Sequence, residues 1–169
     1  DEEAALAAMA QSLGPALTAY HFPEEALQIT RLMQELPPTE PEGRPTPGMQ
    51  PEAAVSAVLG VDMDELTAAV LRHWGLHERL LAAARPLSRS NPVRKPVTRE
   101  ETLRTVASLA HELAATVLLE AEKQPAAVHL VYTRYTRALD LTPKECIQNL
   151  ELATRLVDDR RRPEPVNPA

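Results

Sequence analysis

The sequence predicts an all-α protein, a helical bundle, on three observations. Hydrophobic residues make up 44% of the 169 residues but aromatic residues only 3%, so Leu, Val and Ala must supply most of the core. Alanine and leucine favour helices over strands. Apolar residues recur at helical spacing through most of the chain, and no segment of useful length alternates as a strand does. The 5 glycines leave few sites for a phosphate-binding loop.

The first half of the chain is divided into helices by proline-rich breaks. The expected helices cover residues 2–20, with an interruption at Gly14-Pro15, then 23–36 and 51–59. A proline-rich loop is expected over residues 37–49, because this stretch has too few apolar residues to pack.

A further helix is expected to begin after Asp62, which can form a capping box with Glu65. Its apolar stripe would consist of Leu66, Ala69, Val70 and Trp74, with Gly75 ending the helix. Trp74, the sole tryptophan, is expected to anchor the packing of the short helices. Leu80, Leu81 and Ala84 mark the inner face of the next short helix, which precedes a second loop over residues 86–97.

The last third has the most regular helical pattern. Thr98 and Glu101 predict a capping box, and Thr142, with Glu145 three residues later, predicts the start of the final helix. The expected inward residues are Leu103, Val106, Ala107, Ala110, Leu113, Ala114, Val117 and Leu118, then Val128, Val131, Tyr132, Tyr135 and Leu139, then Ile147, Leu150, Ala153 and Val157. Residues 98–158 would form a helical extension, and residues 159–169 a disordered tail.

Charge and cysteine content argue against several classes of protein. The formal net charge of −6 opposes nucleic-acid binding, which usually requires a basic face. Cys146 is the single cysteine, so it forms no internal disulfide, fits a reducing, cytoplasmic compartment, and is expected to be buried and inert. No apolar run approaches the roughly 20 residues that span a bilayer. The chain opens at Asp1 inside a helical pattern, and we expect it to be a piece of a longer protein.

Two segments carry a resemblance to a known family. In residues 55–87 the matching positions are Leu59, Gly60, Asp62, Glu65 and Leu66, followed by Trp74, Gly75 and Leu76. In residues 6–33 they run from Leu13-Gly14 to the turn at Phe22-Pro23-Glu24. With these motifs the chain resembles the later part of the HDOD (HD-related output domain) family of bacterial signalling proteins. The resemblance implies that residues 1–87 form part of an HD-phosphohydrolase-like scaffold.

The chain departs from an active HD enzyme at three places. HD phosphohydrolases bind metal through His and Asp, which together hold a divalent ion that activates water. Gln11-Ser12 stand where His-Asp would be, Met63 where a histidine often opens the later helix, and Arg85-Pro86-Leu87 where a His-His pair would come. The resemblance therefore implies a degenerate scaffold with no catalytic residue, metal or cofactor. Such a domain would act in signal transduction by binding protein partners.

Other functions stay open. A divergent metal-dependent phosphohydrolase would take its ligands from an unseen N-terminal part. A nucleotide-sensing domain would use the basic segment that contains Arg79, Arg85, Arg89 and Arg94. Residues 98–158 would, in a third alternative, form the bundle of a homodimer.

Candidate contacts for a ligand or partner lie near the tryptophan. They are His73, Trp74, His77, Arg79 and Arg85. His73 and His77 have the i, i+4 spacing of a helical metal pair, but Gly75 lies between them and is expected to break the helix. We therefore expect surface or interface histidines.

Overall fold

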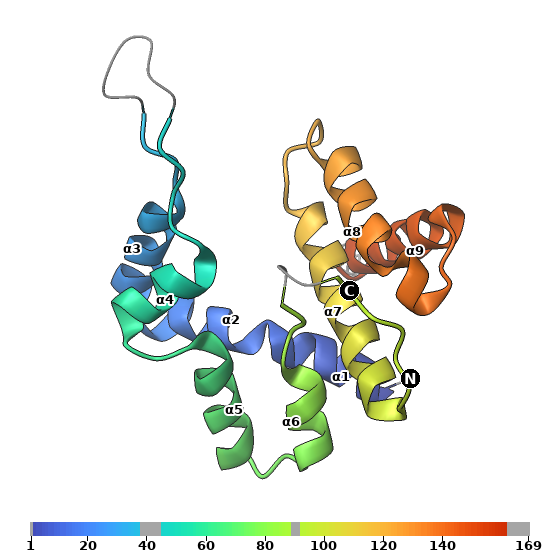
Figure 1. The fold of residues 1–169 in the computed structure, drawn as a ribbon, viewed down its shortest axis with the longest axis horizontal. Helices are drawn as coiled ribbons and strands as arrows, with labels where there is room; N and C mark the ends of the chain where they lie inside the picture. The colour runs from blue at the N-terminus through green and yellow to red at the C-terminus, as the bar shows by residue number, and fades with distance from the viewer. Residues whose placement is uncertain (1, 38–44, 89–91, 162–169) are drawn as a thin grey trace, which may run out of the picture. The chain divides into compact units, whose positions relative to one another are not determined.

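The computed structural model describes residues 2–37, 45–88 and 92–161, of which 157–161 are described by their backbone alone. These residues form nine α-helices and no named strand, which confirms the all-α prediction (Figure 1). The chain divides into two compact units, Asp1–Pro86 and Leu87–Ala169.

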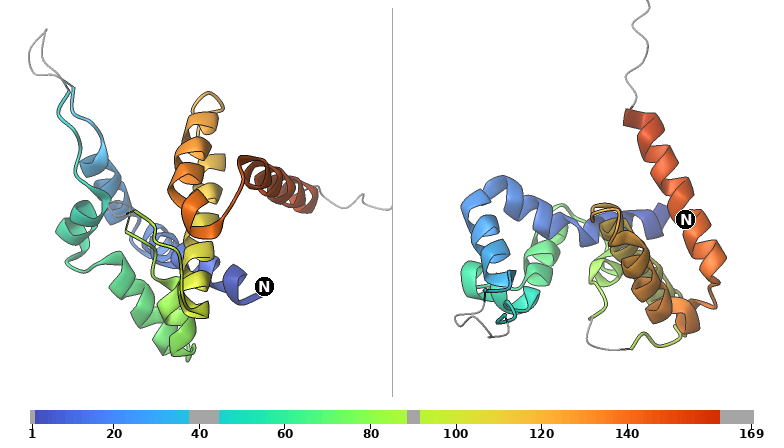
Figure 2. Two further views of the ribbon diagram at one scale, coloured as in Figure 1. Left: turned by 45° about the vertical axis from the view of Figure 1, so that its right-hand side comes forward. Right: turned by 90° about the horizontal axis from the view of Figure 1, so that it is seen from above.

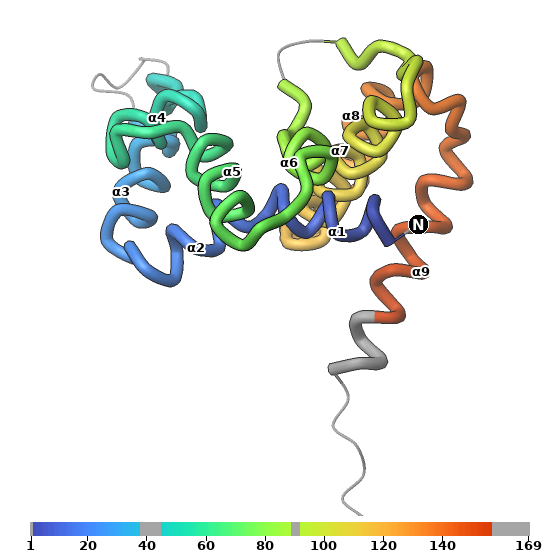
Figure 3. Tube along the Cα trace, turned by 90° about the horizontal axis from the view of Figure 1, so that it is seen from below, coloured from blue at the N-terminus to red at the C-terminus, as the bar shows by residue number. Residues whose placement is uncertain are grey.

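The first unit contains six helices. They are α1 (Glu2–Gln11), α2 (Leu13–His21), α3 (Pro23–Met33), α4 (Pro51–Leu59), α5 (Met63–His73) and α6 (Glu78–Ala84). Helix α1 packs against α6 and α3 against α4, while α2 and α5 contact each other between these two pairs (Figure 3). The buried core around α5 consists of Ala10, Ala68, Leu71, Leu81 and Ala84.

The break between α1 and α2 falls at Ser12, not at Gly14-Pro15 as expected. Pro15 is the third residue of α2, where a backbone N–H has no intrahelical partner, so the proline does not interrupt the helix. Gly14 is buried, and a Cβ there would collide with the hydroxyl of Thr67 on α5. The glycine therefore allows α2 and α5 to approach closely.

Helix α3 ends at Met33, three residues before the expected end at Leu36. Leu36 instead pairs with Thr46 in an isolated antiparallel bridge. The N–H of Met49 also donates to the carbonyl of Leu32 at 2.7 Å. These bonds close the base of the proline-rich loop, whose residues 38–44 lie outside the described part of the chain.

The inner face of α5 differs from the predicted one. Thr67, Ala68 and Leu71 are buried, whereas Ala69 and Trp74, which were predicted to face inward, are exposed. Thr67 tolerates burial because its hydroxyl donates to the carbonyl of Met63 at 2.8 Å. The predicted capping box is also wrong, since the Asp62 side chain makes no cap hydrogen bond.

The second unit contains α7 (Arg99–Val117), α8 (Gln124–Leu139) and α9 (Pro143–Arg161). Helices α7 and α8 lie side by side, and α9 follows at an angle to both (Figure 2). The core consists of Leu109, Leu113, Tyr135 and Cys146, against which Leu87 and Val93 pack from the segment before α7. Helix α9 extends through residues 159–161, which were expected to belong to the tail. Residues 162–169 lie outside the described part.

The faces of α7 and α9 also depart from the prediction. On α7 the buried residues are Thr105, Ala107, Ser108, Leu109, Leu113 and Thr116. Val106, Ala110, Ala114, Val117 and Leu118 are exposed, although all were predicted to face inward. On α9 Ile147 and Ala153 are exposed, and the side chain of Val157 is outside the described part. The burial of Cys146 confirms the prediction for that residue.

A buried ion pair joins α7 to α8. Arg134 Nη1 donates to Glu112 Oε1, and the side chains are only 16% and 12% exposed. Tyr135 donates its hydroxyl to the same carboxylate oxygen at 2.8 Å. Arg134 Nη2 also donates to the carbonyls of Leu87 and Ser88, so one guanidinium holds both a helix and the segment that precedes the bundle.

The capping box predicted for Thr98 and Glu101 is confirmed, and Thr142, which was predicted as the N-cap of the last helix, forms a second one with Glu145. In α7, Thr98 accepts from the N–H of Glu101, whose carboxylate accepts from the N–H groups of Val97 and Thr98 at 2.7 and 3.2 Å. These bonds lower the pKa of Glu101 below its ordinary 4.5, with Val97 contributing most. In α9, hydrogen bonds from the N–H and then the hydroxyl of Thr142 lower the pKa of Glu145 in the same way.

The lowered pKa values of Glu101 and Glu145 lead us to expect a loss of stability in acid. Because the folded pKa lies below the unfolded one, each contributes stability above about pH 4.5 and loses it as pH falls through the folded pKa. We expect the thermal midpoint of the wild type to fall further between about pH 6 and about pH 3 than that of the Glu101→Gln/Glu145→Gln variant. The thermal midpoints are measured by circular dichroism. Equal decreases in the wild type and the variant would contradict a contribution of these two carboxylates to stability.

Candidate functional site

The turn between α5 and α6 carries four of the five predicted contact residues. Helix α5 ends at His73, Trp74 occupies the C-cap, and Gly75 adopts a left-handed φ of 75°. The N–H of Leu76 returns to the carbonyl of Leu71 at 3.1 Å, a hydrogen bond typical of a glycine-terminated helix. The expectation that Gly75 ends the helix is therefore confirmed.

His77 has a structural role that the sequence did not indicate. Its Nδ1 atom accepts a hydrogen bond of 3.2 Å from the N–H of Arg79, which caps α6. Histidine is not among the preferred N-cap residues, so no sequence signal marked this bond. No group of three or more His, Cys, Asp or Glu that could hold a metal ion occurs among the described residues.

Side-chain exposure separates this turn from the core. His73, Trp74, His77 and Arg79 are all exposed, and Trp74 retains 58% of its surface. The expectation that Trp74 anchors the short helices is therefore wrong, because Leu71, Leu81 and their neighbours fill that core.

The arginines of the basic segment proposed for a nucleotide are divided between the two units, since Arg79 and Arg85 belong to the first. Arg85 follows the last residue of α6, about 10 Å along the axis from Glu78, because α6 has seven residues. Arg94 belongs to the second unit and is exposed, and Arg89 lies outside the described residues.

Two of the residues that the resemblance assigns to lost metal ligands, Gln11 and Met63, pack within the first unit, whereas Leu87 packs against the core of the second. Gln11 is buried and donates from Nε2 to the carbonyl of Ala83 at 3.1 Å, which links α1 to α6. Ser12 is exposed between α1 and α2. Met63 has its sulfur 3.7 Å from the Thr18 hydroxyl oxygen and packs against the α3–α4 core.

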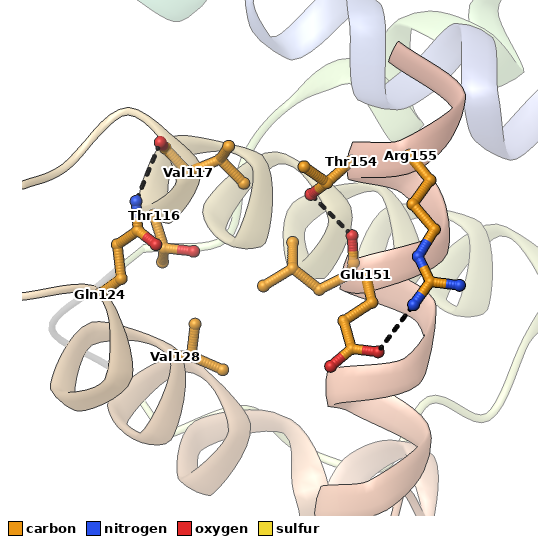
Figure 4. Close-up of a pocket in the computed structure, with 8 residues that line it drawn as sticks. Thr116, Val117, Gln124, Val128, Glu151, Thr154 and Arg155 are labelled. Atoms are coloured by element: carbon orange, nitrogen blue, oxygen red, sulfur yellow. Dashed lines mark hydrogen bonds and ion pairs between the residues drawn. The ribbon is translucent and has the colours of Figure 1, made fainter. Parts of the chain in front are cut away.

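A pocket of about 400 Å³ lies in the second unit where α9 passes the facing ends of α7 and α8 (Figure 4). It is lined by Thr116, Val117, Gln124, Val128, Leu150, Glu151, Thr154 and Arg155. No sequence signal predicted it, since its walls come from three helices.

The polar side chains of the pocket bond mainly to their own helices and turns. Gln124 Nε2 donates to the carbonyls of Val117 and Leu119 at 3.2 and 2.9 Å, and Thr154 donates to that of Leu150. The Nη2 atom of Arg155 lies 3.9 Å from Oε2 of Glu151, which is one helical turn earlier. The remaining lining consists of Val117, Val128, Leu150 and Thr116, whose hydroxyl donates to the carbonyl of Leu113. Such a lining suits the binding of an apolar group better than acid–base chemistry.

Cys146 also lacks the environment of a nucleophile. It lies in the core of the second unit, and burial raises the pKa of its thiol above the ordinary 9.0. Reactive cysteines instead have a lowered pKa and an accessible sulfur.

Comparisons with protein-family models, with curated proteins and with solved structures found no match to this chain. Among the described residues, no helix combines the length and the apolar character needed to cross a bilayer.

Proposed function

We propose that this chain is a non-catalytic regulatory module of bacterial signal transduction that acts through protein–protein interaction. Its scaffold would be HD-like and would lack the metal ligands of the hydrolases. The observation that carries the proposal is the role of Gln11, which stands at a ligand position of the resemblance and holds two helices together.

A metal ligand must direct a lone pair toward an open site, and the side chains at these positions have other roles. Gln11 is 5% exposed and its amide nitrogen bonds to the backbone of α6. The sulfur of Met63 faces Thr18 and lies where a Cβ on Gly14 would collide with it. The Gln11 amide and the Met63 thioether therefore contribute to packing within the first unit. This supports a scaffold in which the metal-ligand positions have a structural role.

Exposed aromatic residues support binding to another protein. The chain has only five aromatic residues, and three of them, Tyr20, Phe22 and Trp74, have at least half of their surface exposed. Tyrosine and tryptophan are enriched among the residues that dominate binding energy at protein interfaces. Single exposed apolar residues are common, but exposure of most of a small aromatic set favours an interaction role.

The proposal is tested by metal analysis and a hydrolase assay on the purified chain. We expect Mn, Fe, Ni and Zn far below one equivalent, and no hydrolysis of a generic phosphodiester when Mn²⁺ or Zn²⁺ is added. Stoichiometric metal together with turnover that is lost in His73→Ala or His77→Ala would overturn the proposal. Those variants serve because both histidines remain exposed and the hydrolase alternative depends on them.

A further inference from the structure

Three of the five arginines of the first unit lie in the segment that runs from the end of α5 to the end of α6, and two of them, Arg72 and Arg79, flank the turn between these helices. Residues 1–86 contain thirteen acidic residues, five arginines and no lysine. Three of those arginines, Arg72, Arg79 and Arg85, lie within fourteen residues that contain a single acidic residue, Glu78. A basic stretch on an otherwise acidic unit is complementary to an acidic partner.

The turn also presents an exposed apolar side chain, that of Trp74, which lies between Arg72 and Arg79 in the sequence. Trp74 is exposed while its neighbours Leu71 and Leu76 belong to the core, so the backbone beneath the indole is fixed. The left-handed Gly75 and the His77 cap hold the turn from both sides. Because the backbone of the turn is already ordered, binding has to order mainly the Trp74 side chain, which has only two rotatable bonds, and this limits the entropic cost of binding.

The surface residues of this turn are Arg72, His73, Trp74, His77 and Arg79, which we call the Trp74 surface. Arg72 Nε lies 3.8 Å from Glu78, but both side chains are more than half exposed, so this pair is weak and can exchange for a partner's carboxylate. Arginine pairs well with carboxylates because its planar guanidinium can donate two parallel hydrogen bonds.

We propose that the Trp74 surface docks an acidic segment of a partner protein, whose carboxylates meet the arginines and whose apolar side chain covers the indole. This inference rests on the proposed function and adds the chemistry of the partner. A protein segment is favoured over a nucleic acid because the net charge of −6 repels a long polyanion, whereas a short acidic segment meets mainly the local positive charge.

The sole tryptophan gives a direct readout. The probe is a synthetic glutamate-rich peptide with one central leucine. It is titrated into the full chain while Trp74 fluorescence is recorded. We expect a saturable blue shift, because the leucine removes water from the indole. With a labelled peptide, Trp74→Ala should weaken binding by about thirtyfold and Arg79→Glu by at least about tenfold.

The matched control is Arg31→Glu, the same charge reversal at an exposed residue of α3, which should leave affinity within about twofold because it lies on another helix. Arg79→Glu places a carboxylate in the first turn of α6, where it is compatible with the helix dipole, so the fold should persist. Equal helix content by circular dichroism verifies this.

Four outcomes would overturn the inference. They are the absence of a shift with the glutamate peptide, equal binding of a lysine peptide, equal or tighter binding of single-stranded DNA, and a shift that depends on protein concentration alone. The last would mean that a second copy of the chain covers the turn. If the chain is also metal-free and without hydrolase activity, any of these results refutes the acidic docking segment and leaves the proposed function standing.

Discussion

Replacing Glu112 by glutamine is expected to lower the free energy of unfolding by about 3–5 kcal/mol, measured by urea denaturation. Glu112 accepts hydrogen bonds from Arg134 and Tyr135, and both members of the ion pair are largely buried. The neutral amide would leave the Arg134 guanidinium without a counter-charge at a largely buried site.

An exposed pair provides the matched control. Lys123 lies 2.8 Å from Glu120, with side chains 69% and 76% exposed, so Glu120→Gln should cost less than about 1 kcal/mol. The Glu112→Met/Arg134→Met variant should recover part of the loss, because apolar side chains of similar volume need no counter-charge, while the Tyr135 hydroxyl loses its acceptor. A cost for Glu112→Gln no larger than that for Glu120→Gln would show that the buried pair contributes little.

Replacing Leu71 by alanine is expected to cost about 2–5 kcal/mol, again from denaturation followed by circular dichroism. Leu71 is 3% exposed and lies in the core that joins α5 to α1 and α6. The truncation removes buried methyl groups and leaves a cavity that the neighbouring alanines, Ala68 and Ala84, cannot fill.

Trp74→Ala, three residues along the same helix end, is the comparison. The indole is mostly exposed, so we expect the free energy of unfolding to change by no more than about 0.5 kcal/mol. A larger cost for Trp74→Ala than for Leu71→Ala would restore Trp74 as the anchor of the short helices and would remove the basis for the Trp74 surface.

The helix positions were largely predictable because they depend on local chemistry. Thr98 with Glu101, and Thr142 with Glu145, form the hydrogen bonds that their spacing indicates. Gly75 ends α5 because glycine readily adopts the left-handed conformation at that position. Asp62 shows the limit, since it occupies the cap position without bonding through its side chain.

The buried faces were less predictable because several core residues are polar. Thr18, Thr67 and Thr105 each donate a hydroxyl hydrogen bond to the carbonyl four residues earlier. That bond satisfies the hydroxyl within the helix and lets the threonine pack as a small apolar residue. A pattern that counts threonine as polar therefore assigns the wrong face to α5 and α7.

In the candidate sites, too, local features were predictable from the sequence and contacts between distant residues were not. The residues of the α5–α6 turn could be named together from the sequence because they are neighbours in the chain, although the exposure of Trp74 was not predicted. The Gln11–Ala83 bond joins residues 72 positions apart, and the pocket of the second unit is assembled from three helices. No local pattern records such contacts, and only the folded chain brings these groups together.

The bonds from Arg134 to the carbonyls of Leu87 and Ser88 have a practical consequence for dissecting this chain. A fragment begun at Pro96, the natural choice from the proline pattern, would lack these acceptors and also Leu87 and Val93 of the core. Such a fragment would present an incompletely bonded guanidinium and a partly opened core, and its aggregation would be easily mistaken for self-association. A fragment begun at or before Leu87 keeps these contacts, and it is the one to use for measuring the oligomeric state of this unit.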